Sequence, residues 1–126
     1  LKRTPDNEPD KKLSLYKELA KFYPKNSLYK EKISLYSKMV ERNKKIQKQF
    51  SGWDGSHMNL VRYIKQSMND PKSYDHMKTV FWDMGDFLVV KTTFRGKNAF
   101  GGLVINAVQA KVDINGNVLE ITNTQP

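Results

Sequence analysis

The sequence predicts an α+β fold: an N-terminal helical hairpin, then one helix packed on a four-stranded antiparallel meander sheet. Three observations lead to this prediction. Apolar residues recur at helical spacing through the first 50 residues, a third and shorter helical pattern follows, and after Pro71 the period becomes alternating. The chain has 126 residues, of which 38% are hydrophobic, so it can bury one core with an appendage.

The helical hairpin is expected at residues 10–50, behind a flexible lead-in at residues 1–9 that holds two prolines. Apolar residues at a helical period predict a first helix that stops before Pro24. Asn26 or Ser27 is suited to cap the helix that follows, because their side chains accept hydrogen bonds from free backbone N–H groups.

The apolar stripe of this second helix is expected to extend as far as Phe50. The stretch LYKELAKFYPKNSLYKEKISLY resembles a single inter-repeat junction of tetratricopeptide type. Such repeats bury a core only against stacked neighbours. We therefore expect the hairpin to pack on the C-terminal domain or on a partner.

The remaining chain, residues 51–126, is expected to form one α+β domain. Asp54 or Ser56 is expected to cap its helix, and Asn69-Asp70-Pro71 to end it. Strands are then expected at residues 76–83, 86–95, 101–113 and 117–122. They are separated by Met84-Gly85, by a glycine-rich segment and by Asn115-Gly116. An Asn-Gly pair between such runs is a strong hairpin signal.

The net charge of +9 is concentrated in the N-terminal part of the chain. Residues 1–50 hold 14 basic and 6 acidic residues, a balance of +8, whereas residues 51–126 hold 8 and 7, a balance of +1. A dense patch lies at Arg42, Lys44, Lys45 and Lys48. Three interpretations remain open: a solvated helix face, a surface for an acidic protein or a membrane, or a contact with nucleic acid.

The C-terminal part resembles a known domain. Its sequence DPKSYDHMKTVFWDMGDFLVVKTTFRGKNAFGG resembles a C-terminal α+β domain of uncharacterised bacterial proteins and, more distantly, a module of bacterial lipoproteins. The likeness covers roughly residues 46–122. It implies a fold and a bacterial origin, but no reaction and no catalytic residue. Because the chain starts at Leu1, an upstream signal or membrane anchor, and hence the compartment, stays open.

The segment FRGKNAFGG is the most site-like stretch of the sequence. A phosphate cradle is usually followed by a helix N-terminus, whereas here Gly101 and Gly102 lead into a strand. The favoured interpretation is a bulged corner in which the glycines adopt positive φ and Phe100 packs underneath. The alternative is a surface where Arg95, Lys97 and Asn98 contact an acidic or carbonyl-bearing partner.

Other candidate sites are weaker. Residues 113–117 resemble the start of a calcium loop without its later ligands, so a hairpin turn is favoured. The two histidines, His57 and His76, are too few for a zinc site, and Asp83 and Asp86 fit solvated turn positions. The aromatic residues Trp53, Phe81 and Trp82 are expected in the core or at its edge.

These observations predict a non-catalytic interaction or structural module, with no cofactor, no metal and no catalytic residue. The expected partner is a protein, and an acidic one would fit the charge of the chain. The alternative function is nucleic-acid binding by the basic helical face, and an enzyme without a recognisable motif is the third choice. The oligomeric state is left open by the sequence.

Overall fold

The computed structural model describes residues 8–125, and these form two compact units that divide between Gln47 and Lys48. The lead-in expected at residues 1–9 falls largely outside the described residues, and Glu8 and Pro9 are the first two residues of a helix.

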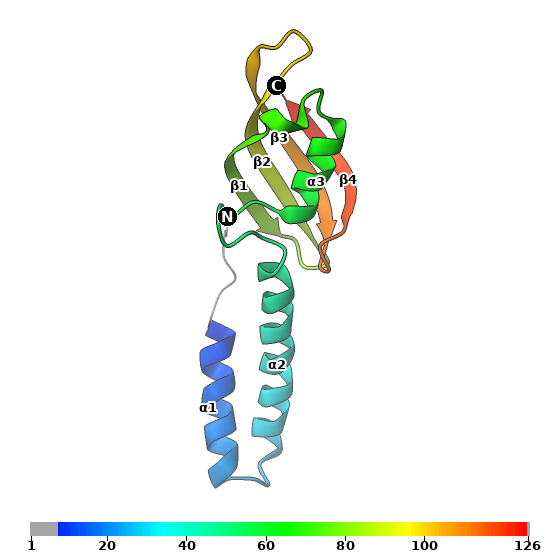
Figure 1. Cartoon of the computed structure of the whole chain (residues 1–126). Coiled ribbons are helices and arrows are strands. Elements are labelled where there is room, and N and C mark those ends of the chain that lie inside the picture. Colours follow the sequence, from blue (N-terminus) through cyan, green and yellow to red (C-terminus); the bar gives the residue numbers. More distant parts are fainter. Residues whose placement is uncertain (1–7, 126) are drawn as a thin grey trace. The chain divides into compact units, whose positions relative to one another are not determined.

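The N-terminal unit is an antiparallel helical hairpin of α1 (Glu8–Phe22) and α2 (Ser27–Gln47) (Figure 1). The Tyr16 ring lies between the helices, 6.0 Å from the ring centroid of Tyr29 and 5.8 Å from that of Tyr36. The side-chain oxygen of Asn26 accepts a hydrogen bond from Tyr29 N at 3.3 Å. Asn26, one of the two residues expected to cap this helix, is therefore the cap of α2.

The second unit holds the short helix α3 (Met58–Ser67), the 3₁₀ turn η1 (Pro71–Ser73) and four strands. The strands are β1 (Asp75–Asp83), β2 (Phe87–Lys97), β3 (Leu103–Asp113) and β4 (Val118–Gln125). They pair antiparallel in the order β1-β2-β3-β4, which confirms the predicted α+β fold with a meander sheet.

The core lies between α3 and one face of the sheet (Figure 1). Along β2 the even-numbered residues from Leu88 to Gly96 are buried, and the odd-numbered ones are not. From α3, Leu60 and Ile64 are buried, and Phe81 of β1 is buried as expected. Each such side chain contributes about 1.5–3 kcal/mol by leaving water.

The start of α3 differs from the expectation. Its cap is His57, whose side-chain Nδ1 accepts a hydrogen bond from Leu60 N at 3.2 Å, so the prediction of Asp54 or Ser56 was wrong. Asp54 instead accepts from Ser56 N at 2.9 Å within the preceding turn. A histidine whose Nδ1 lacks a proton satisfies the free N–H group as a serine or aspartate would.

Phe50 also differs from the expectation, since it is not part of the α2 stripe. It lies beyond the end of α2 and forms an isolated antiparallel bridge with His57. Its ring stacks on Phe81 at 4.9 Å and meets the His57 ring edge-on at 5.2 Å. Phe50 therefore belongs to the core of the second unit.

Candidate binding surface

The hairpin of β2 and β3 is longer than its neighbours. The pairing of β1 with β2 begins at Asp75 opposite Arg95, and the described pairing of β4 with β3 reaches Gln125 opposite Ala107. Between these limits, residues 96–106 pair with neither β1 nor β4 in the described part of the chain: Gly96 and Lys97 pair with Val104 and Leu103, and Ile105 and Asn106 pair with Arg95 and Phe94. We call them the β2–β3 arm, and Figure 1 shows this hairpin projecting past the rest of the sheet.

The tip of the arm is a three-residue hairpin loop closed by Asn98 and Gly102. Asn98 N donates to Gly102 O at 2.9 Å, and Gly101 N donates to Asn98 O at 3.0 Å. The Asn98 Oδ1 atom accepts from Phe100 N at 3.0 Å and from Gly102 N at 2.9 Å. Gly101 has φ +80°, the left-handed position of such loops, whereas Gly102 does not have a positive φ.

The turn between β3 and β4 has the same hydrogen bonds. Asp113 replaces Asn98 as the acceptor, taking N–H groups of Asn115 and Asn117 at 2.9 Å each, and Gly116 has φ +94°. The Asn117 side chain hydrogen bonds to the Asp113 carboxylate and holds its pKa below the ordinary value. Asn115 has no positive φ, so Asn115-Gly116 is not the two-residue turn that the pair suggested.

Phe100 stands at the tip of the arm with 96% of its surface exposed. The expectation that it packs underneath the corner was therefore wrong. Behind it, Leu103 is 58% exposed and Ile105 is 52% exposed. Exposed large apolar residues that lie next to one another, rather than singly, are a mark of contact surfaces.

Two cations share the outer face of the arm with these apolar residues. Lys97 pairs with Leu103 across the ladder, and Arg95 pairs with Ile105 just below the arm. Residues opposite each other in an antiparallel pair lie on the same face of the sheet. Because even-numbered positions face α3, these odd-numbered positions face away from it, and Lys97 also borders the groove at the end of α3.

The charged residues in the sequence of the arm and its flanking strand segments are all basic. From Phe87 to Val112 the chain contains Lys91, Arg95, Lys97 and Lys111 and has no aspartate or glutamate. A carboxylate of β1 acts on this surface: Asp75 Oδ2 accepts from Arg95 Nε at 3.1 Å and also from Nη2. Both side chains of this pair are about half exposed, so the pair stabilises the fold little.

The opposite face of the arm borders a groove of about 250 Å³ at the end of α3. The groove is lined by Ile64, Ser67, Met68, Asn69, Phe94, Gly96, Lys97, Asn98, Val104, Asn106, Val108 and Thr124. A Cβ at Gly96 would lie 2.6 Å from the Met68 Cε atom, so the glycine of Arg-Gly-Lys lets Met68 approach the strand. The volume is below the usual range of small-molecule sites.

The end of α3 that borders the groove determines whether the corner could hold a phosphate. The residues of α3 that line it, Ile64 and Ser67, belong to the C-terminal end of the helix, and Met68 is the residue that caps this end. The backbone dipole is negative at that end, which disfavours a bound anion. The corner therefore offers no helix N-terminus to a phosphate, as the sequence indicated.

The residues expected to meet a partner fall into separate groups. Lys97 and Asn98 lie on the arm, and Arg95 lies at its base. Arg42, Lys44 and Lys45 lie near the C-terminal end of α2 in the helical unit, and Lys48 is the first residue of the second unit. The structure thus brings together the three corner residues but defines no single surface for all seven.

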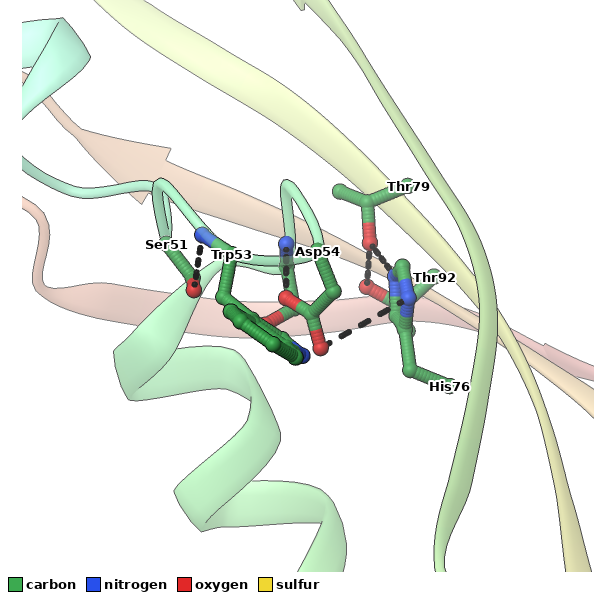
Figure 2. A network of polar contacts seen from close by, with 7 residues as sticks. Ser51, Trp53, Asp54, His76, Thr79 and Thr92 are labelled. Atoms are coloured by element: carbon green, nitrogen blue, oxygen red, sulfur yellow. Dashed lines mark hydrogen bonds and ion pairs between the residues drawn. The ribbon is translucent and has the colours of Figure 1, made fainter.

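A polar network that the sequence did not indicate links the loop before α3 to the sheet (Figure 2). His76 Nε2 lies 2.7 Å from Thr79 Oγ1, and Thr79 Oγ1 lies 3.2 Å from Thr92 Oγ1. On its other side, His76 Nδ1 lies 3.9 Å from Asp54 Oδ2. Hydrogen bonds from Ser56 lower the pKa of Asp54. Burial of the carboxylate raises the pKa, but this effect is smaller.

Carboxylate, imidazole and hydroxyl follow one another here in the order seen in hydrolytic triads. The 3.9 Å between Asp54 and His76 is, however, too long for the hydrogen bond that orients such a histidine. The Thr79 hydroxyl is engaged by buried Thr92. These contacts fit a link between the loop and two strands better than an exposed nucleophile.

Trp53 lies beside this network in Figure 2, on the loop before α3. It is 96% exposed, so the expectation that it belongs to the core or its edge was wrong, whereas Trp82 is half-buried.

Among residues 8–125, no group of three or more His, Cys, Asp or Glu side chains lies close enough to hold a metal ion. No helix of this part of the chain is long and apolar enough to cross a membrane.

Comparisons with known proteins add no relative: no family model matches the chain, and no match was found among the curated proteins or the solved structures. The resemblance carried by the DPKSYDH and FRGKNAFGG segments therefore stays a prediction.

Proposed function

We propose that the chain is a non-catalytic interaction module, and that the β2–β3 arm carries its contact surface. The single observation behind this proposal is the fully exposed Phe100 at the tip of a hairpin that extends past both neighbouring strands. A phenylalanine placed there contributes nothing to the core of its own unit. Its exposure is explained if a partner covers it.

The arm is favoured over the basic patch of α2 for a chemical reason. At the arm, Lys97 and Arg95 lie on the same face as Leu103 and Ile105, so that apolar area and charge can act on one partner. Interfaces draw most of their binding energy from such buried apolar and aromatic anchors. Lysines on a helix face that are surrounded by solvent contribute mostly through screened charge.

The arm can be tested with a photo-crosslinking amino acid. Benzoylphenylalanine would be introduced at Phe100 and, as a matched control, at Trp53, whose side chain is equally exposed. The whole chain would be produced in bacterial cells, irradiated and analysed by mass spectrometry for attached protein, lipid or nucleic acid. We expect a discrete adduct from position 100 that position 53 does not give.

Equal adducts from both positions, or none from position 100, would show that the tip is only a solvent-exposed loop. A nucleic-acid adduct from position 100 would favour the alternative function, in which the basic side chains contact phosphates. Either result would remove the arm as the contact surface of an interaction module.

A further inference from the structure

We infer that the β2–β3 arm docks on an anionic lipid bilayer, with Phe100 and Leu103 in the interfacial region and Lys97 among the lipid phosphates. This inference rests on the proposed function and names the partner class of the same surface. Three features of the arm carry it: its apolar tip, its internally bonded backbone and its charge.

The apolar residues of the arm are arranged for a surface without pockets. Phe100 extends from the tip of the arm, and Leu103 and Ile105 follow on its outer face. A protein partner would need a cavity of matching shape to cover a protruding phenylalanine. A bilayer interface covers it without such a cavity, and membrane-surface segments bury phenylalanine and leucine at that depth.

Four backbone N–H groups of the tip are already bonded within the tip itself. The N–H groups of Asn98, Phe100, Gly101 and Gly102 each donate to an oxygen of Asn98 or Gly102. Moving an N–H group out of water without a partner is costly in lipid, and this loop avoids most of that cost. Binding would thus remove apolar surface from water while leaving these hydrogen bonds in place.

The charge of the arm complements an anionic surface. The chain has no acidic residue from Phe87 to Val112. Asp75 engages Arg95 at the base, whereas no ion pair of Lys97 is found among the described residues. Each basic side chain near an anionic membrane strengthens binding by about fivefold.

The test uses the purified full chain and lipid vesicles. Vesicles of phosphatidylcholine alone are compared with vesicles that contain about one third phosphatidylglycerol, and bound protein is measured by sedimentation. The chain has no cysteine, so Ala99→Cys, which keeps Phe100, and Trp53→Cys each allow a single polarity-sensitive fluorophore to be attached. We expect binding to the anionic vesicles, with a blue shift from the label at position 99 and none from position 53.

Three variants separate the effects of apolar contact and of charge from the loss of an exposed aromatic side chain elsewhere. Phe100→Ser should weaken vesicle binding by about tenfold or more, because the largest apolar side chain of the tip is lost. Asn98→Asp should weaken it by about fivefold through its negative charge. The turn should tolerate that change, because Asp113 accepts the same bonds in the β3–β4 turn. Trp53→Ser should leave binding within about twofold of the original chain.

The inference fails if the full chain stays in the supernatant with both kinds of vesicle, or if the labels at positions 99 and 53 respond alike. A protein adduct from position 100 in cells, together with no vesicle binding, would overturn the lipid inference and leave the proposed function standing. Absence of both an adduct and vesicle binding would overturn both. Vesicle binding that depends on Phe100 and on anionic lipid supports the inference.

Discussion

His57 Nε2 donates a hydrogen bond to Gln49 Oε1 over 2.9 Å, deep in the second unit. The proton is on Nε2 because Nδ1 accepts from Leu60 N. The Gln49 amide in turn donates to Ile114 O at 2.7 Å, in the turn between β3 and β4. One neutral histidine thus caps α3 and, through Gln49, fixes the position of a distant hairpin.

This arrangement predicts a loss of stability in weak acid. Burial lowers the pKa of His57 from 6.5 to about 4. Between these pH values the unfolded chain binds a proton at His57 that the folded chain does not. The contribution of neutral His57 to stability is therefore complete above pH 6.5. We expect this contribution to be lost as the pH falls toward 4, by about 3 kcal/mol in total, in urea unfolding at several pH values.

His57→Asn provides the control, because asparagine can still accept from Leu60 N but does not titrate. The variant should be less stable at neutral pH, since the bond to Gln49 is lost, and its stability should depend less on pH between 6.5 and 4. An unchanged pH dependence in this variant would assign the acid sensitivity to other groups.

The two glycines of the tip should respond differently to substitution. Gly101 has a positive φ and no atom within 4 Å of the position that a Cβ would take, so Gly101→Ala suffers only backbone strain of about 1–2 kcal/mol. Gly102 has no positive φ, and a Cβ there would meet Asn98 at an ordinary 3.4 Å. Gly102→Ala should therefore change the unfolding free energy by less than about 0.5 kcal/mol, and equal losses at both sites would contradict this loop geometry.

Residues 48–126 expressed alone are expected to unfold in a single cooperative urea transition. They contain a helix buried on one face of a four-stranded sheet, which is enough to form a core. Residues 8–47 alone form one helical hairpin and should show little cooperative unfolding. A non-cooperative transition for 48–126 would mean that this unit depends on the hairpin.

Nucleic-acid binding by the basic patch would show itself through salt. A duplex contact made by Arg42, Lys44, Lys45 and Lys48 should give a slope of roughly 3 to 4 in log affinity against log salt. Lys44→Gln combined with Lys45→Gln should then lower the slope by nearly 2. We expect only weak binding near physiological salt; tight binding whose slope responds to these two lysines would favour the nucleic-acid function.

The order and type of the elements could be predicted from the sequence because each depends on local periodicity. The alternation from Leu88 to Gly96 marks a strand buried on one face, and Asn26 before an apolar stripe marks a helix start. Such signals lie within a few residues of the feature that they predict. The fold class needs no long-range contact beyond the packing of α3 on the sheet.

The errors concern features that depend on distant partners. Asp54, Ser56 and His57 all have capping side chains, and the choice of His57 depends on Gln49 and Phe50 around it. Burial of Phe100 and Trp53 was expected because aromatic side chains are usually buried, and nothing local indicated otherwise. The groove required the approach of Met68 to Gly96, which no spacing in the sequence reveals.

The β2–β3 and β3–β4 turns share one pattern of backbone hydrogen bonds over five residues. Some positions of this five-residue unit set the backbone conformation, and others present side chains to solvent. The first residue and the fourth, Asn98 and Gly101 in one turn, set the path of the backbone. The second and third, Ala99 and Phe100, are free to carry any chemistry outward. Grafting NAFGG in place of DINGN would therefore transfer the aromatic tip to the opposite end of the sheet without changing its topology, so binding specificity at this tip can diverge while the scaffold stays constant.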